Sequence, residues 1–325
     1  MSKWMRGLFV AVLGAALSTP VLAQDWPTRP IKLIMPYGAG SGPDVALRPV
    51  VEQLTKLLKQ SVVVENLPSA GGILGSQAIA RATPDGYTFG FANNVTLAVN
   101  QSFYAKLPYD PAKDFEPVAL LFDNAYILVA APGFKPNSVQ EFIALAKANR
   151  GKISFASGTG VGSGSHLTGE MLKSVAGIEM THVPYKAGSQ ALADVVAGRV
   201  DVMFDNVSGV QQFIANGSLK ALAVTSPRRL SQHPTIPTIA ESGMPNFEAV
   251  AWGGIIAPAG TPKTVIQRMN AAIAEAMKAP EVVRNNATMS LNPLVSSPED
   301  FTAFIGKESA KWSDLVRRSG AKSGN

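Results

Sequence analysis

The order strand, glycine-rich loop and helix occurs twice along the chain, and this recurrence limits the possible folds more than any other feature. In the first copy, an apolar run over residues 31–36 leads into a loop with three glycines that ends at Pro43. In the second, a run at 153–156 leads into a loop at 158–165 with four glycines. Each loop is followed by a segment with helical periodicity and then by further strands, which is the pattern of parallel α/β sheets.

Two longer apolar stretches, residues 117–131 and 247–257, follow the two copies. Asp123 and Asn124 interrupt the first of them. Such stretches are typical of strands that cross between lobes, so we predict an α/β fold with two lobes and a ligand cleft between them. The predicted first lobe comprises residues 24–123 and 248–325, and the predicted second lobe comprises residues 124–247.

The two glycine loops are the predicted ligand site. Glycine lets the backbone approach a ligand closely, and the start of a helix offers unpaired N–H groups with a partial positive charge. An anion is favoured at such a position. A carboxylate held between both loops would be bound by backbone N–H groups and by Ser and Thr hydroxyls, without an arginine. The alternative, that the glycines only form tight turns, is weakened by the equivalent placement of the two loops.

Several other functions lack the residues that they require. Gly38, Gly40 and Gly42 give G-x-G-x-G, but Pro43 stands where the dinucleotide fingerprint needs a glycine, and no phosphate-loop motif occurs. A G-x-S-x-G nucleophile motif and histidines at metal-binding spacing are also missing from the sequence. The absence of cysteine excludes thiol chemistry and disulfides. We therefore expect no catalysis, no cofactor, no metal and no nucleic-acid partner.

The first residues read as an export signal. Lys3 and Arg6 precede an apolar run over residues 7–17, and a small-residue pattern ends at Ala23. This order predicts a signal peptide over residues 1–23 that is cleaved after Ala23, rather than a retained anchor. Without it, 27 basic and 23 acidic residues leave a net charge of +4 instead of +6. The predicted location of the mature chain is the periplasm.

Four segments of the chain resemble one protein family. They are Tyr37-Gly38-Ala39-Gly40 with Asp44, GSHLTGE at 164–170, VPYKAG at 183–188 and VDVMFDN at 200–206. They look like the motifs of the Bug family, the TctC-type extracytoplasmic solute receptors of tripartite tricarboxylate transporters. The resemblance implies a flytrap of the periplasmic-binding-protein type that closes on a carboxylated molecule, with a membrane permease as its partner.

The resemblance also implies which residues bind the ligand. The first gripping loop is 37–41, followed by Asp44, which in the family shapes the pocket and can bind the amino group of an amino-acid ligand. Its alternative role is that of a carboxylate favoured at a helix start. The expected ligand-binding residues are Tyr37, Gly38, Ala39, Gly40, Ser41, Asp44, Asn93, Gly158, Thr159, Gly162, Ser163, Gly164, Ser165, His166, Tyr185 and Asp205.

The expected function is therefore that of a monomeric solute-binding protein for a dicarboxylate, a tricarboxylate or an aromatic carboxylate such as terephthalate. Tyr37 stands where the family commonly has phenylalanine, and Asn93-Asn94 stands where small hydroxyl residues are frequent, which would alter the choice of ligand more than the fold. The alternatives are a periplasmic hydrolase or lyase that uses Asp44, His166 or Asp205, and a receptor that signals to a sensor kinase.

Overall fold

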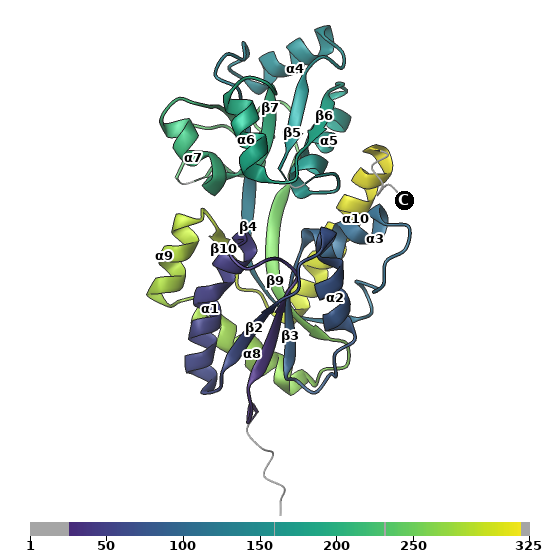
Figure 1. Cartoon of the computed structure of the whole chain (residues 1–325), viewed down its shortest axis with the longest axis vertical. Coiled ribbons are helices and arrows are strands. Elements are labelled where there is room, and N and C mark those ends of the chain that lie inside the picture. Colours follow the sequence, from purple (N-terminus) through teal and green to yellow (C-terminus); the bar gives the residue numbers. More distant parts are fainter. Residues whose placement is uncertain (1–25, 159, 231, 320–325) are drawn as a thin grey trace, which may run out of the picture.

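The computed structural model describes residues 26–158, 160–230 and 232–319. The chain forms two lobes, stacked along the long axis of the molecule and joined by two long strands (Figure 1). This confirms the predicted two-lobed α/β fold. The expected signal peptide at residues 1–23 and the predicted site residue Thr159 lie outside the described residues.

The strands form a curled sheet that continues from one lobe into the other, in the order β2-β1-β3-β9-β4-β7-β5-β6, with β10 and β8 also paired to β4. Strands of the same unit run parallel, β1 with β2 and β3, and β5 with β6 and β7. The strands are β1 Ile31–Met35, β2 Val62–Asn66, β3 Thr88–Asn93, β4 Phe115–Ala130, β5 Ser154–Ser157, β6 Thr181–Pro184, β7 Val202–Asn206, β8 Lys220–Val224, β9 Val250–Pro258 and β10 Asn292–Pro293.

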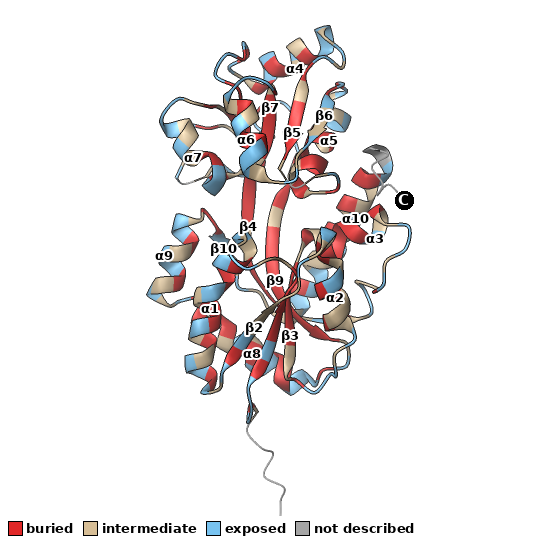
Figure 2. Ribbon diagram, viewed as in Figure 1, coloured by how far each residue is buried: buried red, intermediate tan, exposed pale blue. Residues whose placement is uncertain are grey.

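Strand β4 is the main connection between the lobes. Up to Ala125 it pairs with β9, and from Tyr126 onward it pairs with β7, with β8 also paired to it from Ile127. The change of partner between Ala125 and Tyr126 therefore marks the passage from one lobe to the other. Both connecting strands are buried along most of their length, as Figure 2 shows by the red ribbon between the lobes.

Helices cover the faces of each half of the sheet. Helix α1 begins with Gly42 and Pro43, where the missing N–H of proline costs nothing, and buries Leu47, Val50 and Leu54. The helices are α1 Gly42–Leu58, α2 Ile73–Ala80, α3 Asn100–Phe103, α4 Val139–Ala148, α5 Gly164–Ala176, α6 Gly188–Val196, α7 Val207–Ala215, α8 Lys263–Ala276, α9 Pro280–Thr288 and α10 Pro298–Ser319, with a 3₁₀ turn at Ala70–Gly72 and a π-helix at Val95–Val99.

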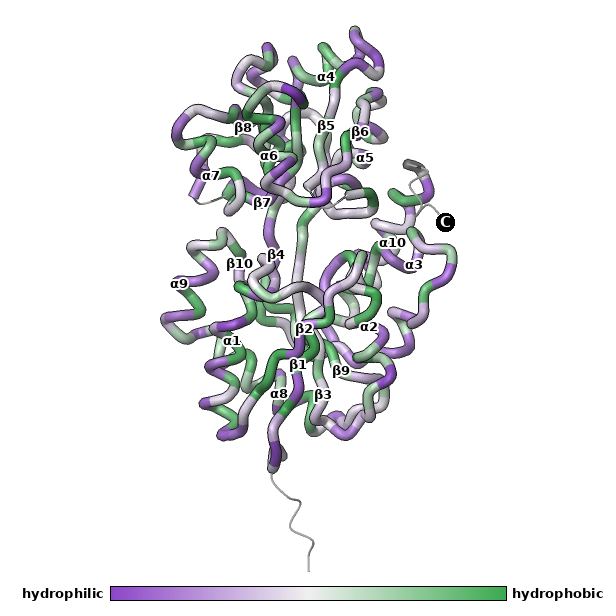
Figure 3. Tube along the Cα trace, viewed as in Figure 1, coloured by the Kyte–Doolittle hydropathy of each residue, from purple (hydrophilic) through white to green (hydrophobic). Residues whose placement is uncertain are grey.

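The strands carry the hydrophobic core of each lobe, which Figure 3 shows as green segments in the tube. A third apolar cluster extends from one lobe into the other and includes Leu128 of β4 and Trp252 of β9. Helix α10 packs against β4 and α3 of the first lobe and α5 of the second. The buried carboxylate of Glu308 accepts hydrogen bonds from the indole N–H groups of Trp252 and Trp312, both at 2.9 Å. The C-terminal helix is thereby tied to a connecting strand.

Candidate functional site

The two glycine loops lie where parallel strands end and helices begin. The first follows β1 and runs into α1, and the second follows β5 and runs into α5. In an open α/β sheet, the loops beyond the carboxyl ends of the strands form the ligand crevice. Helices α1 and α5 are 17 and 13 residues long, and each offers an anion unpaired N–H groups at its first turn. Two first-turn positions are exceptions, because Pro43 in α1 has no N–H and the N–H of His166 in α5 already donates to Ser163.

Tyr126, on the connecting strand β4, is where the elements of the two lobes meet. A β-carbon at Gly164, the first residue of α5, would overlap the Tyr126 hydroxyl and lie 3.6 Å from Nδ2 of Asn94 at the end of β3. Glycine is therefore required at Gly164 by this close approach. A β-carbon at Gly162 would lie 2.7 Å from the ring of Phe103 in the first lobe, and its φ of +83° also favours glycine. The second glycine loop thus rests directly against the first lobe.

Two further predicted residues lie around Tyr126. Burial raises the pKa of the Tyr37 hydroxyl, which donates a hydrogen bond to Oδ1 of Asn93 at 3.0 Å, and the neighbouring Tyr126 hydroxyl raises that pKa further. Burial also raises the pKa of Tyr126, and the carboxylate of Asp205 raises it further. Tyr37, Tyr126 and Asp205 are therefore close enough to interact electrostatically, although they come from the first lobe, the connecting strand and the second lobe. Burial raises the pKa of Asp205 to about 6, although the hydrogen bond from the backbone N–H of Asn206 acts to lower it.

Four buried polar atoms at these strand ends have no hydrogen-bond partner among the described residues. They are Oγ of Ser41, Nδ2 of Asn94, Oγ of Ser165 and Oδ1 of Asn206. Ser41 and Asn206 are the N-cap residues of α1 and α7, yet neither side chain caps its helix. A buried polar group without a partner costs about 1–3 kcal/mol, so most such groups in native proteins are satisfied. These four atoms are the natural partners of a polar ligand.

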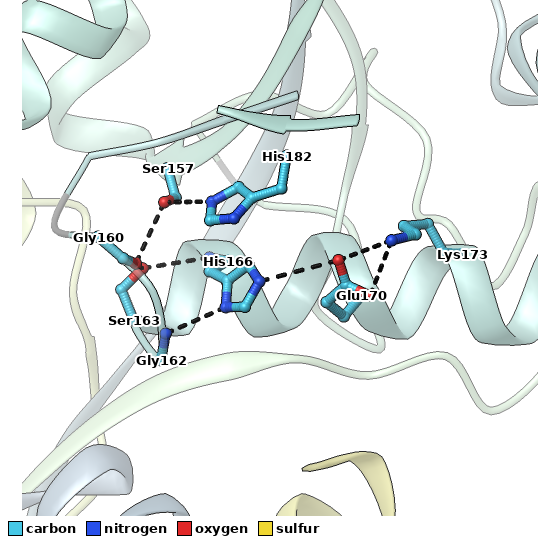
Figure 4. A network of polar contacts seen from close by, with 8 residues as sticks. All are labelled: Ser157, Gly160, Gly162, Ser163, His166, Glu170, Lys173 and His182. Atoms are coloured by element: carbon cyan, nitrogen blue, oxygen red, sulfur yellow. Dashed lines mark hydrogen bonds and ion pairs between the residues drawn. The ribbon is translucent and has the colours of Figure 1, made fainter. Parts of the chain in front are cut away.

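The second glycine loop is held by hydrogen bonds within its own unit (Figure 4). Nδ1 of His166 accepts a hydrogen bond from the backbone N–H of Gly162 at 3.0 Å. The Ser163 hydroxyl donates to the carbonyl of Gly160 at 2.8 Å and accepts from the His166 N–H, which caps α5. His166 is buried. The imidazole of His166 therefore helps to fix the shape of the loop.

A stack of rings supports this histidine from behind. The rings of His166 and His182 stack with centroids 4.0 Å apart, and Phe155 stacks on His182 at 4.8 Å. Nε2 of His182 lies 2.7 Å from the Ser157 hydroxyl, and Figure 4 shows the His182 ring above that of His166. Burial, with smaller contributions from the charges of His182 and Lys173, lowers the pKa of His166 to about 3. Burial and the charge of Lys173 lower the pKa of His182 to about 4. Both imidazoles are neutral at ordinary pH.

Asp44 is saturated by groups of its own lobe. Its carboxylate accepts hydrogen bonds from the backbone N–H of Gly40 at 2.9 Å, from Nη2 of Arg48 at 2.9 Å and from Nδ2 of Asn66 at 3.0 Å. Burial acts to raise the pKa of Asp44, but these hydrogen bonds outweigh it and hold the pKa below its usual value. The carboxylate therefore shapes the first loop, and its charge is already neutralised by Arg48.

The remaining predicted residues are more exposed. Gly38 is half-buried, while Ala39 and Gly40 lie at the surface of the first loop. The hydroxyl of Tyr185 donates to Oδ2 of Asp194 at 2.5 Å, so its polar end turns toward helix α6. Gly158 packs against Gly188, the first residue of that helix.

Three residues of the site were not among the expected ligand-binding residues: Asn94, Tyr126 and Asn206. Asn94 and Asn206 directly follow residues that were expected, at the ends of β3 and β7. Tyr126 lies in a long apolar run, where its hydroxyl next to Asp123-Asn124 was the available signal. Its role depends on how the second lobe folds back, which local sequence does not reveal.

The described parts of the chain contain neither a metal-binding cluster nor a membrane-spanning helix. Over residues 26–158, 160–230 and 232–319, no group of three or more His, Asp or Glu side chains is arranged to hold a metal ion. In those same ranges, none of the helices is long and apolar enough to cross a membrane.

Comparison with known proteins gives a consistent result. The model of the tripartite tricarboxylate transporter family receptor matches residues 46–321. The protein BugT of Bordetella pertussis is 36% identical over 317 residues, which cover 97% of this chain and 96% of BugT. The solved structure of the periplasmic binding protein BugD has a TM-score of 0.77 and 33% identity, with 91% of this chain and 99% of that one covered. The solved structure of R. palustris Rpa4515 with adipate has a TM-score of 0.80 and 30% identity, with 91% of this chain and 99% of that one covered.

Proposed function

Because the chain belongs to the tripartite tricarboxylate transporter receptor family, we propose that it is a periplasmic receptor that captures a small carboxylate between its two glycine loops. Members of this family are receptors, and the solved relatives are solute-binding proteins rather than enzymes, which confirms the expectation of a non-catalytic protein. The hydrolase or lyase alternative is thereby set aside. The related Rpa4515 structure holds adipate, a dicarboxylate, which supports this class of ligand.

The observation that carries the proposal is the set of four unpartnered polar atoms, two at the starts of α1 and α5 and two at the ends of β3 and β7. Two belong to the first lobe, Ser41 and Asn94, and two to the second, Ser165 and Asn206. Neither loop contains lysine or arginine. A carboxylate is therefore bound by neutral donors, by Ser hydroxyls, the Asn94 amide and the N–H groups at the starts of α1 and α5, with helix dipoles supplying the favourable potential.

Capture proceeds by closure of the two lobes. The proposed lobes are residues 24–123 with 248–325, and residues 124–247, and the proposed hinge is where β4 changes partners at Ala125 and Tyr126. A ligand that bridges both loops favours the closed form, because only that form makes both sets of contacts. The loaded receptor then delivers its ligand to the membrane permease subunits of a tripartite tricarboxylate transporter.

Thermal unfolding with a panel of ligands tests the proposal. Adipate, succinate, citrate and terephthalate are compared with the corresponding amides, which lack the charge. One carboxylate class should raise the melting temperature in proportion to the logarithm of its concentration, as mass action requires. The proposal fails if no carboxylate binds while the protein is folded, or if the amides stabilise it equally.

A matched pair of variants locates the binding. Ser165→Leu places an apolar side chain where an unpartnered hydroxyl is buried, and should abolish the shift while the ligand-free melting temperature changes little. Ser189 occupies the same second position of helix α6 but is exposed, so Ser189→Leu should leave both quantities unchanged. A shift that survives Ser165→Leu would place the carboxylate elsewhere.

A further inference from the structure

A cavity lies beside the connecting strands, away from the glycine loops. Its volume is about 710 Å³, within the range of small-molecule sites. None of the residues expected to bind the carboxylate lines it. One wall is formed by residues 226–230 and 232 of the second lobe, the other by helix α9 with β10 of the first lobe, and the floor by β4 at Asp123–Ala125 with Val250 of β9. Figure 1 shows α9 and β10 on one side of β4, and α10 with α3 on the other.

This cavity contains two opposite charges that form no ion pair with a residue in the described part of the chain. Asp123 is partly buried on β4, and burial raises its pKa to about 6. A hydrogen bond from the Asn292 side chain lowers this pKa, and the charge of Glu248 raises it. Arg228, in the opposite wall, is exposed. The neighbouring Arg229 differs, because it pairs with Glu241 at 2.9 Å.

The remaining lining is divided between polar amides and apolar side chains. Asn124 and Asn286 are both more than nine-tenths buried, and Oδ1 of Asn124 and both amide atoms of Asn286 have no hydrogen-bond partner within the described ranges. Leu230 and Val283 supply apolar surface from the second and the first lobe. A partly buried acid without a cation and an arginine without an anion are both better satisfied by one molecule that carries both charges.

We propose that this cavity is a second ligand site, which takes a small zwitterion with its ammonium group on Asp123, its carboxylate on Arg228 and its carbon chain against Leu230. The site is separate from the carboxylate site, which offers neutral donors and a saturated Asp44. A simple carboxylate leaves Asp123 without a partner and is repelled by it. A simple amine leaves Arg228 without one.

The absence of cysteine permits a direct test. Val283 is 52% exposed on α9, and Val63 is 57% exposed on β2, away from the cavity. A single trifluoromethyl label is attached to Val283→Cys or to the control Val63→Cys in the full chain carrying Ser165→Leu, and is followed by ¹⁹F NMR. The probes are 4-aminobutanoate, 5-aminopentanoate and 6-aminohexanoate, with hexanoate and hexylamine as partners that each lack one charge.

At least one aminocarboxylate should shift the Val283→Cys signal saturably and bind at least tenfold more tightly than hexanoate or hexylamine, with no change at Val63→Cys. Arg228→Gln and Asp123→Asn should each reduce that affinity about tenfold, whereas Arg229→Gln, which alters an arginine already paired, should have little effect. The proposal is overturned if the single-charge probes bind as well, if Arg229→Gln weakens binding as much as Arg228→Gln, or if the label reports no binding at all. Folding of each variant is checked by its melting temperature, so that loss of binding is not confused with loss of structure.

Discussion

Nδ1 of His166 accepts a hydrogen bond from the backbone N–H of Gly162, at 3.0 Å, within the loop that is proposed to bind the ligand. Because the backbone donates, Nδ1 carries no proton, and the ring proton lies on Nε2, which faces Oε1 of Glu170 at 3.8 Å. The ionic state of one imidazole therefore controls the shape of the loop. Protonation of Nδ1 would break this contact.

Replacement of His166 should separate its positioning role from ligand contact. Asparagine offers an acceptor oxygen near the position of Nδ1, whereas leucine leaves the Gly162 N–H unpaired. We expect His166→Leu to weaken binding of the carboxylate found by thermal unfolding about tenfold, and His166→Asn to weaken it less than about threefold, since one hydrogen bond is worth about 1 kcal/mol. Isothermal titration calorimetry measures both. Equal losses in the two variants would indicate that the imidazole contacts the ligand directly.

The buried histidines should make the protein less stable in acid. The pKa values of His166 and His182, at about 3 and about 4, lie below the ordinary value of about 6.5 that applies when the chain is unfolded. Below about pH 6.5 the unfolded chain binds more protons than the folded chain. The contribution of the two histidines to the free energy of unfolding is therefore fully present above about pH 6.5 and is lost as the pH falls below it. The expected loss between pH 7.5 and pH 5 is about 2 kcal/mol per histidine.

Two buried acids change the stability with pH in the opposite direction, so a histidine variant is needed to isolate the effect of the histidines. Asp123 and Asp205, whose pKa values are raised to about 6, favour the folded state as the pH falls below 6. Urea unfolding of wild type and His182→Gln at pH 7.5 and pH 5 removes their contribution, because both proteins contain them. Between pH 7.5 and pH 5, the free energy of unfolding of the wild type should fall by about 2 kcal/mol more than that of His182→Gln. A constant difference would mean that His182 is protonated in the folded protein.

Asp44 should matter for stability but not for the choice between ligands with and without an amino group. Asp44→Asn removes the charge that pairs with Arg48, and we expect a loss of about 1–3 kcal/mol in the free energy of unfolding. Because the folded pKa is lowered, this contribution is present above about pH 4 and disappears in stronger acid. The affinity ratio of aspartate to succinate should be the same in the variant and the wild type. A selective loss of aspartate binding would restore Asp44 as a ligand for the amino group.

Glu308 should hold helix α10 against the connecting strand β9. Glu308→Ala leaves the indole N–H groups of Trp252 and Trp312 without their acceptor, and Lys311 without its ion-pair partner. We expect a loss of about 2–5 kcal/mol in the free energy of unfolding, as found when a buried charged group is removed from its partners. Glu308→Gln keeps an acceptor oxygen and should lose clearly less. Urea unfolding followed by tryptophan fluorescence checks both, and similar values for the two variants would argue against this role.

Local patterns were sufficient to identify the strands and helices around both glycine loops. The apolar run before Tyr37 is β1, the glycines before Pro43 precede α1, and the second unit repeats this order, because alternation, helical period and turn residues are properties of neighbouring residues. The long run around Tyr126 is the connecting strand β4, as its length indicated. Shorter elements with weaker patterns, such as the π-helix at Val95–Val99 and the two-residue strand β10, were not predicted.

The sequence by itself therefore determined the two-lobed α/β architecture and the positions of the two glycine loops, since periodicity and glycine spacing are local. Only the tertiary structure decided what the polar side chains do. Asp44 is satisfied by Arg48 and Asn66, and His166 binds its own loop. Among the described residues, Nδ2 of Asn94 and Oγ of Ser165 have no hydrogen-bond partner. Whether a polar group is free or satisfied depends on which distant residues pack against it, and this is fixed only when both lobes assemble around Tyr126.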